Sequence, residues 1–184
     1  MHSLCYKEGE CFVKTIEVTL DPKSIQAAIK KLRRYQKSIE QKTQRLVQRL
    51  TDLGAEVARI KIVSMGAVYS GELLAGVDGY FSPLLNVGFV RVTSDHVAFV
   101  EFGTGIVGKN SPHKNGEYLS KAAWQYATGP KIITTRDGRV GWIYPTDDGG
   151  FRFTEGMAAR PFMYETALHL QRVFPKIAKG VFSK

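Results

Sequence analysis

Cysteines are scarce in this sequence: Cys5 and Cys11 are the only two among 184 residues. Their spacing fits neither a Cys-x-x-Cys redox motif nor a zinc knuckle, so we expect free thiols, with a local disulfide in an extracellular protein as the alternative. No apolar run is long enough to span a bilayer, and residues 1–14 lack the apolar stretch and cleavage site of a secretory signal. These absences predict a cytoplasmic chain without membrane association.

Signatures of catalysis are also lacking. The sequence holds no Gly-x-Ser-x-Gly motif, and its four histidines show no His-x-x-x-His spacing. Asp147 and Asp148 resemble the acidic pair of a metal-dependent nuclease, but the two glycines that follow them favour a hairpin turn. Glu101 stands between Phe99 and Phe102 without an evident partner in the sequence. We therefore predict no catalytic, cofactor-binding or metal-binding residues.

A formal Gly-x-Gly-x-x-Gly pattern runs from Gly103 to Gly108. A dinucleotide site also needs a helix immediately after this pattern, so that the phosphates meet free N–H groups. Residues 109–116 read Lys-Asn-Ser-Pro-His-Lys-Asn-Gly, which is a poor helix former, and no parallel βαβ unit surrounds them. We interpret the pattern as a glycine turn that leaves a strand.

Positive charge is abundant and unevenly placed. The formal net charge is +9, and residues 21–61 alone hold 11 Lys/Arg against 4 Asp/Glu. A one-sided positive surface attracts nucleic acid or an acidic protein surface, although it is also typical of a solvated helix face. Because Tyr35 is the only aromatic residue in this segment, we expect no base-specific readout, whereas non-specific attraction to phosphates stays open.

The same residues 21–61 carry the clearest structural pattern, a long basic helix. Asp21 and Pro22 are typical of a helix start, and Gly54 predicts a bend or a break between two helices. Apolar residues recur at steps of three and four, with Gln36 and Thr43 at the two weak positions, and we expect this stripe to pack on a sheet. The stripe consists of Ile25, Ile29, Leu32, Ile39, Leu46, Leu50, Leu53, Val57 and Ile60.

Shorter elements are predicted elsewhere, and together they indicate a single α+β domain over residues 1–184. Its small antiparallel sheet would pack against the N-terminal helix and a C-terminal helix. The predicted elements are a strand within an N-terminal arm at 1–20, a strand at Glu72–Val77, a hairpin at 84–102, a long loop insertion at 103–141 with a short helix within 118–128, a hairpin within 141–154, and a helix at 161–178 that Pro175 ends or kinks.

Two segments resemble a known family. Residues 98–105 read Ala-Phe-Val-Glu-Phe-Gly-Thr-Gly, and residues 158–163 read Ala-Ala-Arg-Pro-Phe-Met before an amphipathic helix. Such a pair, separated by a variable loop, resembles the minor tail-component family of tailed bacteriophages. These are the neck, tail-completion or head–tail joining proteins of lambdoid-type phages and phage-derived particles.

The resemblance implies a non-enzymatic virion protein that is assembled in the cytoplasm of a bacterial host. It would form a ring of identical copies, sixfold by the resemblance, between the head connector and the tail tube. Its partners would be other copies of itself and neighbouring neck, connector, tail-terminator or tail-tube proteins, with non-specific DNA contact in the lumen.

The motif residues gain structural roles from this resemblance. Gly103 and Gly105 would permit a sharp exit from a strand, Arg160 would pair with Glu101, and Phe162 would fill the core. The motif set is Phe99, Glu101, Phe102, Gly103, Thr104, Gly105, Arg160, Pro161 and Phe162.

Eight basic residues are candidates to face a partner or DNA. They are Lys30, Arg33, Arg34 and Lys37 on the helix, and Lys109, Lys114, Arg136 and Arg139 in the loop. Two other functions stay open: a basic nucleic-acid-binding module, and, less favoured, a small metal-dependent nuclease or hydrolase that uses Glu101 or Asp147 and Asp148.

Overall fold

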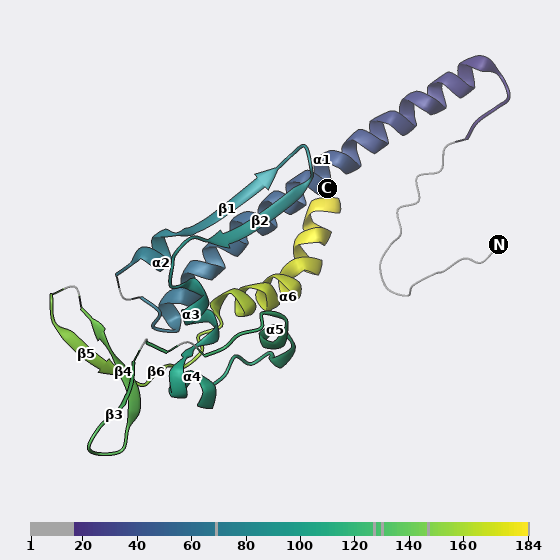
Figure 1. The fold of residues 1–184 in the computed structure, drawn as a ribbon. Helices are drawn as coiled ribbons and strands as arrows, with labels where there is room; N and C mark the ends of the chain where they lie inside the picture. Colours follow the sequence, from purple (N-terminus) through teal and green to yellow (C-terminus); the bar gives the residue numbers. More distant parts are fainter. Residues whose placement is uncertain (1–16, 69, 127, 130, 147, 184) are drawn as a thin grey trace. The chain divides into compact units, whose positions relative to one another are not determined.

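The computed structural model describes residues 17–68, 70–126, 128–129, 131–146 and 148–183. In these ranges the chain is an α+β protein with a long N-terminal helix, small antiparallel sheets and a C-terminal helix (Figure 1). The chain divides into two units, Met1–Lys42 and Thr43–Lys184. Among the described residues, no helix combines the length and apolar character that crossing a membrane requires.

Helix α1 (Pro22–Ser64) begins where its sequence predicts. The Asp21 carboxylate accepts hydrogen bonds from the backbone N–H groups of Lys23 (2.9 Å) and Ser24 (3.1 Å), which have no partner inside the helix. The predicted break at Gly54 is wrong, because α1 continues through it. A Cβ atom there would lie 2.7 Å from Cγ2 of Val90, so glycine allows a strand to approach the helix closely.

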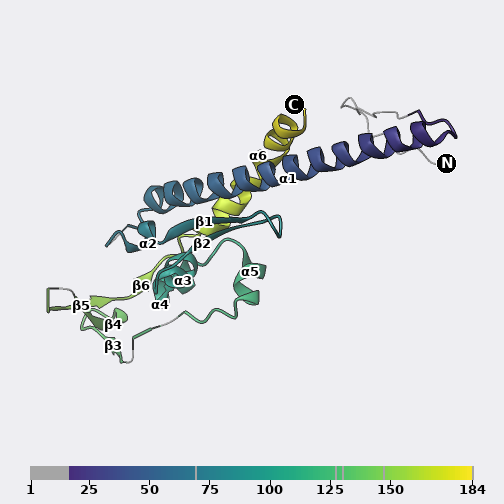
Figure 2. The same cartoon turned by 90° about the horizontal axis from the view of Figure 1, so that it is seen from above.

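Strands β1 (Val77–Ser82) and β2 (Val87–Val92) form an antiparallel pair beside residues 43–64 of α1 (Figure 2). Gly79 and Gly88 sit against Thr51 of the helix, and Gly79 also faces Ala55. Small residues on both sides therefore bring the strands close to α1. Tyr80 pairs with Phe89 in the register, and both are exposed on the other face of the pair.

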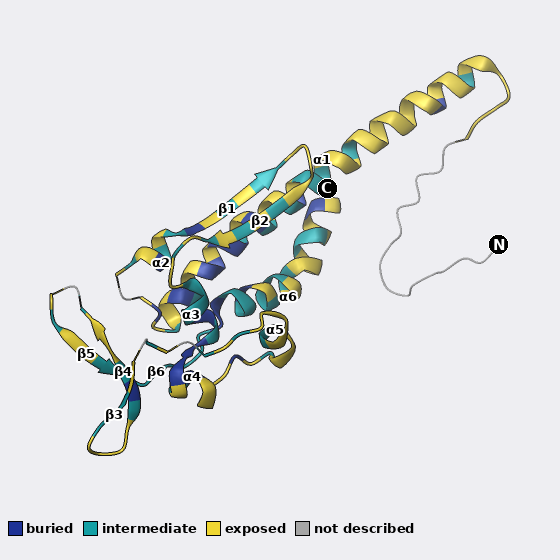
Figure 3. Ribbon diagram, in the orientation of Figure 1, coloured by how far each residue is buried: buried dark blue, intermediate teal, exposed yellow. Residues whose placement is uncertain are grey.

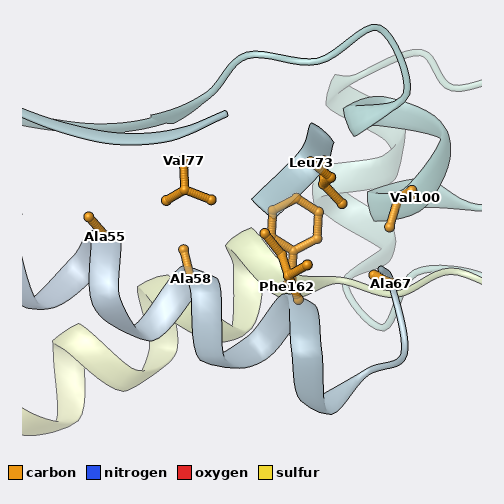
Figure 4. Close-up of a cluster of buried hydrophobic side chains, with 8 residues drawn as sticks. Ala55, Ala58, Ala67, Leu73, Val77, Val100 and Phe162 are labelled. Carbon is orange, nitrogen blue, oxygen red and sulfur yellow. The ribbon is translucent and has the colours of Figure 1, made fainter. Parts of the chain in front are cut away.

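The hydrophobic core of the Thr43–Lys184 unit gathers around the start of α6 (Phe162–Phe182). Figure 4 shows Phe162 among side chains from α1, α2 and α3. Phe162 is fully buried, as the sequence predicts for it. The buried cluster consists of Ala55, Ala58, Ile62, Ala67, Leu73, Val77, Val100 and Phe162.

The second sheet has the order β3-β4-β5, made of β3 (Ile132–Thr134), β4 (Val140–Pro145) and β5 (Phe151–Thr154). The predicted hairpin within 141–154 is confirmed, since β4 and β5 pair antiparallel. Strand β3 was not predicted and lies inside the segment expected to be a loop.

The predicted long loop at 103–141 is wrong, because α4 (Gly105–Asn110), α5 (Gly116–Lys121) and β3 interrupt it. The helix expected within 118–128 is α5, which begins at Gly116 and ends at Lys121. Asn115 explains this start, because its side-chain oxygen accepts the backbone N–H of Tyr118 at 3.0 Å.

The predicted hairpin at 84–102 is also wrong. Its first half contains β2, but β2 pairs with β1, and the second half forms helix α3 (Val97–Phe102). A short apolar run such as Val-Ala-Phe-Val-Glu-Phe fits a strand or a buried helix equally well, so periodicity alone does not separate the two. The strand predicted at Glu72–Val77 is corrected likewise: α2 (Glu72–Ala75) occupies most of it and β1 begins at Val77.

The C-terminal helix extends beyond the predicted residue 178, to Phe182, and Pro175 lies inside it rather than at its end. A proline removes one backbone hydrogen bond, and here the helix resumes after that loss. Other predictions fall outside the described residues, namely those for Cys5, Cys11, Asp147 and residues 12–16 of the N-terminal strand. The described residues 17–20 are not in a strand.

Candidate functional site

The two motif segments meet at the start of α6. Arg160 donates its backbone N–H to the carbonyl of Val100 at 2.8 Å, and Met157 donates its own to Oγ1 of Thr104 at 3.1 Å. Thr104 and Gly105 also bridge to Met157 and Gly156 of β6 (Gly156–Met157). Segments separated by more than fifty residues thus form one structural unit, which we call the motif junction (residues 98–105 and 156–164).

Glu101 is the central polar residue of the motif junction. Pro161, at the N-cap position of α6, has no N–H and offers no capping side chain. Glu101 supplies the cap instead: Oε2 accepts the N–H of Met163 at 2.9 Å and Oε1 accepts that of Tyr164 at 3.0 Å. A carboxylate at this position also interacts favourably with the positive end of the helix dipole.

Burial governs the ionisation of Glu101. The residue is only 4% exposed, and burial raises the pKa of its carboxyl, while the hydrogen bonds from Met163 and Tyr164 and the neighbouring His113 act in the opposite direction. The predicted pairing of Arg160 with Glu101 is wrong: among the described residues, no ion pair joins them, and Arg160 contributes its backbone instead. Because both carboxylate oxygens accept backbone N–H groups inside the protein, Glu101 is placed to hold α6 rather than to act as a general base.

His113 lies against Glu101 with a fully buried side chain. The backbone N–H of Asn115 donates to Nδ1 at 3.0 Å, and Nδ1 also lies 3.3 Å from the carbonyl oxygen of Asn115. Nε2 in turn lies 3.5 Å from Oε1 of Glu101. The rings of Phe102, Tyr118 and Tyr164 surround the imidazole at centroid distances of 5.1–5.5 Å. Sequence reasoning missed this role, since only a lone histidine in a polar stretch marked it.

The aromatic motif residues pack on Trp124. Phe99 and Phe102 lie 5.8 and 5.2 Å from its ring centroid, and its indole N–H donates to the carbonyl of Gly103 at 3.0 Å. Gly103 has φ +81°, and a Cβ atom there would lie 2.8 Å from both the N of Ala159 and the O of Met157. Gly103 and Gly105 therefore allow the sharp turn that the sequence predicts, but the turn leaves a helix rather than a strand.

Helix α4 begins inside the Gly-x-Gly-x-x-Gly pattern, at Gly105, and ends at Asn110, so residues 111–115 after the pattern are not helical. The pattern comes after helix α3 and not after a strand, so it lacks the strand–turn–helix arrangement of a dinucleotide site. Thr104 and Gly105 are buried and bridged to β6, which leaves no open phosphate cradle there.

Several acidic groups are engaged within the chain. Glu165 on α6 accepts from Lys114 at 3.0 Å and lies 3.6 Å from Lys61, and the hydrogen bond from Lys114 lowers the pKa of Glu165. Asp148 accepts hydrogen bonds from Thr146 and from the N–H of Gly150 within its turn. Nowhere in the described ranges do three or more His, Cys, Asp or Glu side chains gather as metal ligands would.

The structure separates the basic candidates into two groups. Lys114 is paired with Glu165, and Arg139 is paired with Asp137 at 2.8 Å and lies over the ring of Phe153. All eight are exposed, and no ion pair joins the other six to another described residue: Lys30, Arg33, Arg34, Lys37, Lys109 and Arg136. Four of these six lie on α1.

Comparison with protein-family models gives no match, and neither curated proteins nor solved structures show a matching relative.

Proposed function

We propose that this chain is a virion structural protein, a tail-completion or neck subunit whose ring joins the head connector to the tail tube and lets DNA pass. The observation that carries the proposal is the motif junction, in which the two segments of the phage resemblance meet through Glu101. The carboxylate of Glu101 and the hydroxyl of Thr104 are used inside the chain. These internal hydrogen bonds are what we expect of a motif with a structural role.

Exposed apolar side chains on β1 and β2 support an assembly role. Tyr80 and Phe89 stand side by side on the face of the pair that turns away from α1, and Val87 follows on that face. Leu84 at the tip between the strands is 93% exposed, and Leu85 is exposed beside it. Contiguous apolar surface of this kind is typical of a protein that is covered by partners.

Electron microscopy of particles produced by the genetic element that encodes the chain tests the proposal directly. We expect density for this chain in a closed ring at the neck, and genes for portal, capsid and tail-tube proteins beside its own gene. Density elsewhere in the particle, or particles that lack the chain altogether, would contradict a neck subunit.

Variants separate assembly from folding. The double change Tyr80→Ser and Phe89→Ser removes exposed rings, so the chain should fold normally while heads and tails stay unjoined. Phe151→Ser is the control, because it removes an even more accessible ring from the other sheet and should leave particles infectious. Infectious particles from the Tyr80 and Phe89 double variant would show that this surface is not needed to join heads and tails.

The motif junction has its own variants. Glu101→Ala and Gly103→Val should also yield unjoined heads and tails, because both disturb the start of α6. Normal infectious particles from both would count against the role of the motif. Counting joined and unjoined structures by microscopy gives the readout in each case.

A further inference from the structure

The apolar stripe of α1 has two different environments. In the Thr43–Lys184 unit, Leu46 is 7% exposed and packs into the protein. In the Met1–Lys42 unit, Leu32 of the same stripe is 55% exposed, and Ile25 and Ile29 are exposed as well (Figure 3). An exposed stripe with steps of three and four residues is the pattern with which one helix packs against another.

The net charge of residues 22–42 as a whole indicates the sign of the partner. Residues 22–42 contain seven Lys/Arg and one acidic residue, Glu40. Arg33 borders the stripe, since it lies about 40° from Ile29 around the helix axis. A second copy of the same helix would bring like charges together, whereas acidic residues beside a partner's stripe would be attracted.

Gln36 indicates the kind of partner. It lies in the middle of the stripe, about 20° from both Ile25 and Ile29 around the axis. Its Nε2 donates to Oε1 of Glu40 at 2.9 Å. An amide in this position is costly to bury in lipid, but a single polar residue in the seam sets the register of paired helices. A nucleic-acid duplex, for its part, would leave the isoleucine and leucine side chains uncovered.

We propose that residues 22–42 form a two-helix coiled coil with an acidic amphipathic helix of a partner protein. This inference specifies the kind of protein surface that the proposed neck subunit binds, and it rests on that proposed function. The binding test uses the isolated chain and no phage particle. Absence of binding would therefore contradict the coiled coil, whereas absence of the chain from the neck would contradict the proposed function.

The test measures binding of the full chain to a synthetic acidic peptide of about four heptads. The peptide carries Ile and Leu at the seam positions, one Asn opposite Gln36, and Glu beside the seam. Isothermal titration calorimetry gives the affinity, and circular dichroism of each variant confirms that α1 is retained. Leu32→Ser should weaken binding at least about tenfold, because it removes a buried seam residue.

Arg33→Glu and Arg34→Glu form a matched pair of neighbours with the same charge change. Both residues are exposed, but Arg34 lies about 140° from Ile29, on the far side of the helix. Arg33→Glu should weaken binding about fivefold or more, and Arg34→Glu by less than about twofold. Equal losses would show diffuse charge attraction and overturn the coiled coil.

Four further results would also overturn it. They are no binding of the acidic peptide, equal binding of a peptide with the same composition in scrambled order, preferred binding of a DNA duplex or of phosphatidylglycerol vesicles, and self-association of the chain through this stripe in analytical ultracentrifugation. Stripe-dependent binding of the ordered acidic peptide alone supports the proposal.

Discussion

The carboxylate of Glu101 accepts the backbone N–H of Tyr164, 63 residues further along the chain, at 3.0 Å. Helix α6 begins at a proline that offers no cap, so the group that completes its first turn comes from α3. Together with the hydrogen bond from Met163, this contact joins the two segments of the phage resemblance beside the buried Phe162. The motif is therefore understandable as a helix cap delivered from a distant segment.

Removing this cap should destabilise the whole Thr43–Lys184 unit. Glu101→Ala leaves the N–H groups of Met163 and Tyr164 without their acceptor, and we expect a loss of about 2–4 kcal/mol in the free energy of unfolding. Urea denaturation followed by circular dichroism measures it. Glu117→Ala, on the exposed face of α5, is the control and should change stability by less than about 0.5 kcal/mol. Equal effects of the two changes would refute the capping role.

The pH dependence of Glu101 has a defined sign. Its pKa is raised above the ordinary value of 4.5 by burial, so the folded state holds the proton more tightly than the unfolded state. Its contribution to stability is therefore fully present below pH 4.5 and is lost as pH rises through the folded pKa. Accordingly, Glu101→Gln should lower the free energy of unfolding most at acidic pH, and this loss of stability should become smaller as pH rises. A cost that grows with pH would contradict this assignment.

Glu165 should show the opposite behaviour. The hydrogen bond from Lys114 lowers its pKa below 4.5, so its contribution is present above pH 4.5 and is lost as pH falls through the folded pKa. Glu165→Gln should therefore destabilise the protein at neutral pH and become neutral in acid. Unfolding titrations of Glu165→Gln and Lys114→Ala at several pH values check this, and the two variants should converge with the wild type at low pH.

Gly103 and Gly138 allow backbone strain to be separated from steric conflict. Their φ angles are +81° and +83°, but a Cβ atom would meet backbone atoms of Ala159 and Met157 only at Gly103, and open space at Gly138. Gly138→Ala should cost about 1 kcal/mol for its left-handed conformation alone. Gly103→Ala should cost at least about 1–2 kcal/mol more, because the backbone itself must shift. Thermal denaturation of both variants measures the two losses of stability. Equal losses would mean that the close approach of Ala159 and Met157 to Gly103 adds no destabilisation.

Local signals in the sequence predict some elements well. Asp21 and Pro22 mark the start of α1 because the capping atoms lie within three residues of the groups they cap. The hairpin of β4 and β5 is predicted by turn residues between two β-segments, a local pattern as well. The fold class follows from the same kind of information, since a long helix, short strands and a final helix leave few arrangements.

Non-local contacts explain what the sequence does not reveal. In the sequence Glu101 has no evident partner, because the backbone N–H groups that it accepts belong to Met163 and Tyr164, more than sixty residues away. Gly54 is a helix breaker by propensity, yet β2 and α6 pack against it and hold α1 continuous. His113 packs against the motif junction through the rings of Phe102 and Tyr164, and no spacing pattern in the sequence indicates these contacts.

Ile60 and Ile62 show where periodicity misplaces the core, and they provide the final test. The steps of three and four residues put Ile60 on the buried stripe, but it is 56% exposed, while Ile62 is fully buried. Ile62 lies about 160° from Ile60 around the helix axis and shares a face with Ala55 and Ala58, so the core also covers a side of α1 that the stripe does not include. Ile62→Ala should cost about 2–4 kcal/mol and Ile60→Ala less than about 1 kcal/mol. Urea unfolding of the two variants compares them directly, and a larger loss for Ile60→Ala would mean that the stripe, and not the small-residue face with Ala55 and Ala58, packs on β1 and β2.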